Sequence, residues 1–252
     1  MNIMNGPMLD MIRLNEKNIE SFDQYPFSVP IIKELRELSF SSNVTFFVGE
    51  NGSGKSTLLE AIAMNAGFGA EGGSKNINFR SAREAHYTAA HTLSDALTLS
   101  WRMKPRDGYF FRAESFFNVA SYIDYLELEC GGNAYRAYGD KSLHAQSHGE
   151  SFLSFFKSRV GSRNGFFIFD EPEAALSPQR QLSLLVILHE MCKTGAQFII
   201  ATHSPLLLAF PGATIYSCDA QSIMPVDYHD TESYRITKEF LNNPEGYFEH
   251  LF

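Results

Sequence analysis

Eight consecutive residues have the types and the spacing needed to hold phosphate groups. They are Gly49, Glu50, Asn51, Gly52, Ser53, Gly54, Lys55 and Ser56, and they match the pattern GxxxxGK[ST] in full. Glycines let the backbone curl with its N–H groups directed inward, and a following helix adds its partial positive charge. The pattern predicts a P-loop, extending to Thr57, that binds ATP, with Lys55 at the β- and γ-phosphates and Ser56 on Mg²⁺.

Two adjacent acids end an apolar segment later in the chain. Residues 166–169 read FFIF and are followed directly by Asp170 and Glu171. Because adjacent strand residues face opposite ways, we expect the two carboxylates to do different work. We predict that Asp170 holds Mg²⁺ and that Glu171 polarises the water that attacks the γ-phosphate. A solvated pair at a strand end is the alternative, and the P-loop upstream favours the catalytic interpretation.

A histidine follows the next predicted strand. It lies in the segment ATHSP, residues 201–205. In an open parallel sheet the carboxyl ends of the strands line the ligand crevice. We therefore predict that His203 is catalytic, with a hydrogen bond to the γ-phosphate or to the attacking water, although a lone histidine is more often structural.

The segments around these residues alternate between strand and helix patterns. Strands are predicted at residues 11–14, 44–48, 96–101, 109–111, 166–169 and 197–201, and helices at 31–38, 56–65, 115–126, 151–160 and 178–192. Residues 214–218 and 223–226 are expected to pair, and residues 236–252 to be helical with a break at Pro244. This alternation predicts an α/β fold with a largely parallel sheet flanked by helices and a small antiparallel side layer from the first strand and the strand at 96–101.

Three segments together resemble the ABC-type ATPase heads of the RecF/SMC-like branch, the compact bacterial "AAA family ATPase" proteins. They are GENGSGKST at 49–57, FIFDEPEAALSP at 167–178 and ATHSP at 201–205. The resemblance implies one ABC-type P-loop ATPase domain over residues 1–252, with inserts expected to be mobile at 67–95 and 131–148. It also implies that Glu171 is the catalytic carboxylate, that residues 174–177 form the D-loop, and that His203 is the switch histidine.

Two features depart from the family pattern. The family's signature, usually LSGGQ or a relative, has its best match at Ser147-His148-Gly149-Glu150, where a plain capped helix start is the alternative. There is also no glutamine between Ser56 and Ala145, so the family's Q-loop glutamine, a metal and water contact, is absent. Glu114 is the nearest replacement as a metal ligand, and capping a helix suits it equally well.

The resemblance also predicts how two copies assemble. One P-loop leaves a side of the γ-phosphate open, and Ser147 and Gly149 of a second copy can supply the missing donors at a helix N-terminus. We therefore expect a homodimer with ATP and Mg²⁺ between its subunits. No sustained heptad lies between Lys55 and Ser147, which indicates a head without a coiled-coil arm.

The charge distribution bears on other partners. The net charge of −8 argues against a surface covered with phosphate-binding lysines. The stretch 75–112 nevertheless holds seven basic and three acidic residues, interleaved with Trp101, Tyr109, Phe110 and Phe111. This stretch could form a nucleic-acid groove with stacking groups, or an ordinary surface over buried aromatic residues. One of its arginines could instead reach the nucleotide. Tyr25 and Phe27 are candidates to stack on adenine.

The cysteines and the hydropathy indicate a compartment. Cys130, Cys192 and Cys218 are widely spaced and suit free thiols in a reducing environment. No apolar run approaches the roughly 20 residues of a membrane span, and the first residues have no secretory pattern. We expect a cytoplasmic protein without membrane insertion.

Three functions fit these patterns. The first is an ATP-hydrolysing switch in DNA maintenance or in genome and phage defence. The second is an ATP-dependent regulator of a separate effector protein, such as a nuclease or a toxin. The third, the ATPase subunit of a membrane transporter, is disfavoured by the missing glutamine and the atypical signature, because such subunits usually couple to membrane partners after the Q-loop.

Overall fold

The computed structural model describes residues 6–69, 72–73, 89–113, 124–125, 127–129, 135, 142 and 165–252. The predicted helix at 151–160 and most of the predicted helix at 115–126 lie outside these residues. Most of the stretches 67–95 and 131–148 lie outside them as well.

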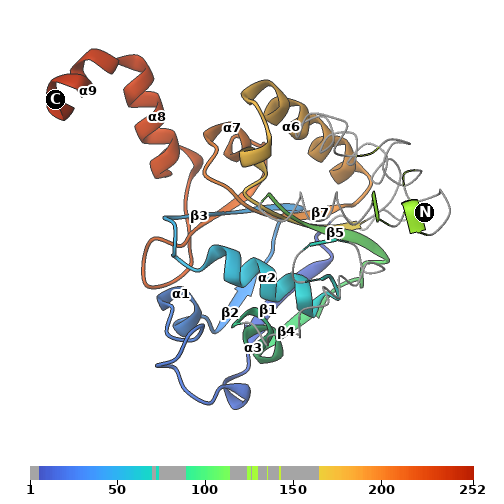
Figure 1. Ribbon diagram of the computed structural model, residues 1–252. Coiled ribbons are helices and arrows are strands. Elements are labelled where there is room, and N and C mark those ends of the chain that lie inside the picture. The colour runs from blue at the N-terminus through green and yellow to red at the C-terminus, as the bar shows by residue number, and fades with distance from the viewer. Residues whose placement is uncertain are drawn as a thin grey trace.

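The larger of two sheets has six strands in the order β5-β6-β7-β3-β8-β9 (Figure 1). They are β3 (Val44–Val48), β5 (Asp107–Arg112), β6 (Gly165–Asp170), β7 (Gln197–Ala201), β8 (Thr214–Ser217) and β9 (Met224–Pro225). All neighbouring strands pair in parallel except β8 and β9, which are antiparallel. Every residue of β3, β6 and β7 is buried, as expected of parallel strands that are covered on both faces. The predicted, mostly parallel α/β fold is confirmed.

Helices cover the two faces of this sheet (Figure 1). On one face lie α2 (Lys55–Asn65) and α3 (Ala89–Ala96), and on the other α6 (Pro178–Lys193) and α7 (Pro205–Leu208). Alternation along β6 divides its side chains between two cores, because Phe166 packs in the cluster that contains α2 and Phe167 in the cluster that contains α6. Because the strands from β5 to β8 in this order are parallel, their carboxyl ends lie together at one edge of the sheet.

A second sheet of three antiparallel strands forms the predicted side layer. Its order is β2-β1-β4, with β1 at Leu9–Leu14, β2 at Glu37–Ser39 and β4 at Leu97–Trp101. The buried side chain of Gln197 joins the two sheets, since its Oε1 accepts from Leu9 N at 2.7 Å and its Nε2 donates to Leu9 O at 3.1 Å.

Two sequence predictions need correction. The helix expected at 31–38 is shorter, because α1 spans only Pro30–Lys33 and the chain then enters β2. Leu38, opposite Ile12 in the small sheet, is buried there, so strand pairing overrides the helical pattern. In addition, the end of the stretch 67–95 is helix α3, whose Leu93 is fully buried against the core around α2, so this end is packed and not mobile as expected.

The C-terminal part is helical on both sides of Pro244, as predicted. Helices α8 (Glu232–Asn242) and α9 (Pro244–Leu251) extend away from the sheet and contain no buried residue (Figure 1). A short 3-10 turn, η5 (Tyr228–Asp230), precedes α8; two others lie at Glu16–Asn18 (η1) and Pro172–Ala175 (η4). Within the described part of the chain, no helix has the length and apolarity to span a membrane. The cysteines described there, Cys192 and Cys218, are free thiols, as expected.

Candidate functional site

The P-loop connects the end of β3, in the middle of the large sheet, to the start of α2. Gly49, Gly52 and Gly54 have φ angles of 144°, 85° and 98°, which other residue types rarely adopt. At Gly54 space is also limiting, because a Cβ there would lie 2.7 Å from Cγ1 of Val29. These glycines let the chain turn sharply, so that the N-terminus of α2 lies at the carboxyl end of the sheet.

Lys55 is held inside this loop. It is only 4% exposed, and its Nζ donates to the carbonyl oxygens of Gly49 at 2.5 Å and Glu50 at 2.8 Å. Burial lowers the pKa of the Lys55 ammonium, and the nearby carboxylates of Glu171 and Asp170 raise it by a smaller amount. The result is a buried cationic group at a helix N-terminus, an arrangement that suits an anion.

The outer side of the loop is held by Asp219, a residue that the sequence analysis missed. Its Oδ1 accepts from the backbone N–H of Glu50 at 2.7 Å, and its Oδ2 accepts from the hydroxyl of Ser217 at 3.1 Å. Asp219 comes just after β8, which pairs with β3. The rule that polar residues at carboxyl strand ends line the crevice would have indicated it.

Ser56 and Asp170 bring two distant motifs together. The Ser56 hydroxyl donates to Asp170 Oδ1 at 3.0 Å, and Asp170 is buried. Both line a cavity of about 320 Å³ together with Arg112, Glu171 and three alanines, Ala113, Ala174 and Ala175.

The donor set of this cavity fits Mg²⁺ shared with phosphate groups. Mg²⁺ prefers hard oxygen ligands and is usually held by one or two protein groups, with waters and substrate phosphates completing its shell. The hydroxyl of Ser56 and the carboxylate of Asp170 are ligands of this kind. The structure assembles no cluster of three or more His, Cys, Asp or Glu among the described residues, so an all-protein metal cage is not present there.

Glu171 has an unusual backbone conformation. Its φ of 51° and ψ of 53° are left-handed, and no other described non-glycine residue has a positive φ. A backbone hydrogen bond of 3.0 Å from Glu171 N to Ala201 O fixes this turn to the end of β7. Strained backbone of this kind is found preferentially at functional sites.

The Glu171 side chain shares its surroundings with His203. Glu171 Oε1 lies 3.9 Å from His203 Nε2, and both side chains are 42% exposed. This distance exceeds a hydrogen bond, so the two groups face the same accessible space without binding each other tightly. The carboxyl ends of β6 and β7 thus place a potential base beside an imidazole.

Two hydrogen-bonded links join the turns that follow β6 and β7. In the first, Glu173 Oε1 accepts from the backbone N–H of His203 at 2.6 Å. In the second, the hydroxyl of Ser204 donates to Gln181 Oε1 at 2.5 Å, and Gln181 Nε2 donates to Leu176 O at 3.2 Å. The expected D-loop, residues 174–177, is therefore tied to the His203 turn.

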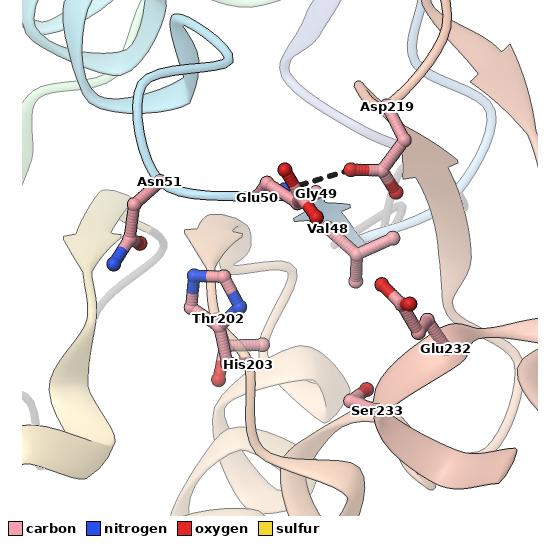
Figure 2. A pocket seen from close by; sticks show the side chains of 9 residues that line it. All are labelled: Val48, Gly49, Glu50, Asn51, Thr202, His203, Asp219, Glu232 and Ser233. Atoms are coloured by element: carbon pink, nitrogen blue, oxygen red, sulfur yellow. Dashed lines mark hydrogen bonds between the residues drawn. The ribbon is translucent and has the colours of Figure 1, made fainter. Parts of the chain in front are cut away.

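A second cavity, of about 440 Å³, lies on the His203 side of the P-loop (Figure 2). Figure 2 shows Asn51 of the P-loop beside His203, with Glu232 and Ser233 of α8 across from them. The P-loop and the His203 turn consequently form one continuous open surface at the edge of the sheet.

The structure unites most of the predicted site. Residues 49–57, Asp170, Glu171 and His203 all lie at the carboxyl ends of β3, β6 and β7, which are adjacent in the sheet. Glu114, Ser147 and Gly149 lie outside the described residues. Of the two adenine candidates, Phe27 is buried in the core and is excluded, whereas Tyr25 is exposed and its hydroxyl lies 2.8 Å from Thr57 Oγ1.

Of the two interpretations of residues 75–112, the structure favours the surface over buried aromatics. Tyr109, Phe110 and Phe111 belong to β5 and are at most 3% exposed, so they cannot stack on bases. Trp101 is partly buried and packs edge-on against Phe166. Arg102 pairs with Asp10, and Arg112 pairs with Glu60 and Asp170. Lys75, Arg80 and Arg83 lie outside the described residues.

Comparisons with known proteins agree with this geometry. A family model described as "AAA domain" matches residues 13–109, and a second, described as "AAA domain, putative AbiEii toxin, Type IV TA system", matches residues 147–209. The fold is similar to an Smc head domain from Pyrococcus furiosus bound to the C-terminal domain of ScpA, with a TM-score of 0.52, 12% identity, and coverage of 93% of this chain and 99% of that one. The chain has the fold of an ATPase head of the ABC/SMC type.

The ATPase head is also similar in fold to an SmcHead bound to the C-winged helix domain of ScpA, with a TM-score of 0.51, 13% identity, and coverage of 87% of this chain and 98% of that one. In sequence it is 25% identical over 200 residues to "Arabinose import ATP-binding protein AraG" of Mannheimia succiniciproducens, which covers 72% of this chain and 38% of that protein. It is 21% identical over 187 residues to "Ribose import ATP-binding protein RbsA" of Bacillus cereus, covering 69% of this chain and 37% of that protein.

The ATPase head therefore spans less than two fifths of the length of these two import proteins. The proteins it resembles thus include SMC heads in fold and import proteins named as ATP-binding in sequence. The matches to AAA-domain models agree with a P-loop ATPase.

Proposed function

We propose that this ATPase head hydrolyses ATP with Mg²⁺ and acts as a switch by closing into a homodimer around the nucleotide. The observation that supports this best is the 3.0 Å hydrogen bond between Ser56 and Asp170, which joins the P-loop to the end of β6. It brings the two groups expected to hold the metal into one cavity with Glu171.

In the proposed site the binding groups divide the work. Lys55 leaves its loop carbonyls to contact the β- and γ-phosphates, and the N-terminus of α2 adds its partial positive charge. Ser56 and Asp170 hold Mg²⁺, whose charge offsets that of the phosphate oxygens. Tyr25, exposed beside Thr57, is the group available to stack on adenine.

Glu171 and His203 act on the γ-phosphate. Glu171 accepts the proton of the attacking water, whose oxygen forms a new bond to the γ-phosphorus while the bond to the β-phosphate oxygen breaks. His203 donates a hydrogen bond to the charge that develops on the γ-phosphate oxygens. The products are ADP and inorganic phosphate. The 3.9 Å separation of the two side chains supports this division, because both can reach a group that lies beside the pair.

A second copy completes the site. Ala174 and Ser177 of the expected D-loop are exposed, and Ala174 lines the cavity, as a segment that reaches a partner must do. Ser147 and Gly149 of the partner would then donate to the γ-phosphate. Hydrolysis removes the group that joins the two subunits, so ATP turnover controls association.

We propose DNA maintenance or genome and phage defence as the setting, with control of a separate effector protein as the second candidate. Burial of the aromatic residues of β5 weakens the case for a nucleic-acid groove at that position. Exposed apolar side chains on the two C-terminal helices, such as Leu241 and Leu251, favour the protein partner. A transporter subunit is the least favoured candidate, because the segment after β5 lacks the family's glutamine.

The test is phosphate release by the purified protein with ATP, with and without Mg²⁺, and with double- or single-stranded DNA added. We expect release that requires Mg²⁺. Stimulation by DNA supports the first setting, and its absence favours an effector protein. Release that persists unchanged in Lys55→Ala protein would contradict the assignment of the site.

A further inference from the structure

The cavity that contains Ser56 and Asp170 also contains a cationic side chain, that of Arg112. Arg112 is the last residue of β5, the edge strand next to β6. Its side chain is 21% exposed, and it lines the cavity of about 320 Å³ together with Ser56, Asp170 and Glu171.

Strand register explains why Arg112 reaches this position. β5 and β6 pair in parallel with Arg112 opposite Asp170, so both side chains leave the sheet on the same face. Arg112 Nε lies 3.6 Å from Asp170 Oδ2, and Arg112 Nη1 lies 3.3 Å from Glu60 Oε2. Glu60 follows Ser56 by one turn of α2, so α2 and β6 together hold the guanidinium in place.

The chemistry of the guanidinium decides what it can bind. Arginine has five N–H donors and no acceptor, so it cannot replace the family's glutamine as a metal ligand. Its donors suit phosphate oxygens, which a planar fork recognises well. Because Arg112 lines the cavity and is held there by Glu60 and Asp170, its guanidinium is placed to contact an anion bound in the cavity.

We propose that Arg112 is a further nucleotide-binding residue that contacts the γ-phosphate of ATP from the end of β5. This inference rests on the proposed function of the site. Arg112 would supply a cation after β5, whereas the sequence analysis expected a carboxylate, that of Glu114, to replace the family's glutamine there. The contact distinguishes ATP from ADP, since ADP has no γ-phosphate, and this distinction is what a nucleotide-controlled switch needs.

The experiment measures the Kd of the full chain for ADP and for a non-hydrolysable ATP analogue, AMPPNP, by calorimetry in the presence of Mg²⁺. For Arg112→Ala we expect AMPPNP to bind about ten- to a hundredfold more weakly, the range for a charge-assisted hydrogen bond, and ADP to change by less than about threefold. Arg112→Lys keeps the charge and should recover part of the AMPPNP affinity.

Glu60→Gln is the matched control, because it removes the charge that pairs with Arg112 without changing a group in the cavity. It should leave the ratio of the two Kd values unchanged. If Arg112→Ala weakens the binding of both nucleotides equally, Arg112 only supports the packing of α2 on β6 and the inference is wrong. Arg112→Gln, which is shorter and uncharged but keeps the stem of the side chain and an N–H donor, serves as the readout if the alanine variant unfolds, and it should show the same selective loss.

Failure of the proposed function looks different. Wild-type protein would then bind neither nucleotide, or Lys55→Ala would bind both as tightly as wild type does. A wild type that binds both nucleotides in a Lys55-dependent way, with an Arg112→Ala variant of unchanged AMPPNP-to-ADP ratio, overturns the Arg112 contact alone.

Discussion

The carboxylate of Glu173 accepts the backbone N–H of His203 at 2.6 Å, so the turn after β6 holds the turn after β7. We expect Glu173→Ala to lower kcat about tenfold or more with little change in KM for ATP. The His203 side chain remains, but the hydrogen bond that fixes the position of its backbone is lost. Glu173→Gln keeps an acceptor oxygen and should retain most of the rate. Steady-state phosphate release gives both constants. Equal loss in the alanine and glutamine variants would argue for a role of the charge instead.

His203 itself should matter more than its support. In His203→Ala the donor expected at the γ-phosphate is lost, and we predict a fall in turnover of about ten- to a thousandfold with nucleotide affinity largely kept. Rapid-quench single-turnover assays would separate this chemical step from product release. An unchanged rate would mean that His203 is structural, which is the more common role for a single histidine.

Lys55→Ala should abolish measurable ATP binding while the fold remains intact. The Lys55 ammonium lies within 2.8 Å of two carbonyl oxygens of the P-loop, at the N-terminus of α2 where the phosphates are expected to bind. Circular dichroism and calorimetry with ATP are the measurements. The variant removes a buried charge whose pKa burial already lowers, so its Tm is expected to stay close to that of wild type.

The two acids after β6 should fail in different ways. Glu171→Gln keeps size and hydrogen bonding, so we expect ATP binding without turnover. Asp170→Asn should instead weaken Mg²⁺-dependent nucleotide binding, because Asp170 is the carboxylate that Ser56 contacts. Titration of nucleotide affinity against Mg²⁺ separates the two variants. If Glu171→Gln retains near-wild-type turnover, Glu173 is the next residue to test as the group that positions the water.

Local patterns predicted the centre of the fold and which residues meet at the carboxyl ends of its strands, because there sequence and structure depend on the same residues. The run at Val44–Val48 is apolar since it is buried on both faces, and the glycines after it are required by their positive φ angles. The end of β6 at Asp170 could be predicted in the same way, because its apolar run is also buried on both faces. A pattern confined to one strand and the loop after it can therefore be recognised from the sequence alone.

Predictions failed where distant pairing decides the conformation. Glu37–Ser39 is a strand because β1 lies beside it, and nothing in its own residues shows that contact. Asp219 enters the site through the order of strands in the sheet, with β8 next to β3. The sequence indicated that an arginine between residues 75 and 112 could reach the nucleotide, but only the pairing of β5 with β6 shows which one lies at the site. The aromatic residues of β5 left two interpretations open because a buried strand can have the same composition as an exposed aromatic face.

Association of two copies is the prediction with the most mechanistic content. Glu171→Gln protein should dimerise with ATP and Mg²⁺ and be more monomeric without them, because the nucleotide supplies the contacts that join the subunits. Size-exclusion chromatography with light scattering measures the mass under both conditions. The D-loop link through Leu176, Gln181 and Ser204 would then transmit the state of one site to the other.

The decisive variant adds Ser147→Arg to Glu171→Gln. If Ser147 of one copy faces the γ-phosphate bound by the other, the bulky side chain enters only the partner's site. It should therefore block dimerisation while each subunit still binds ATP, as calorimetry on the same sample can check. A dimer that forms regardless of ATP and of Ser147→Arg would contradict the shared site, but it would leave the ATPase assignment in place, since Lys55, Ser56 and Asp170 meet within one chain.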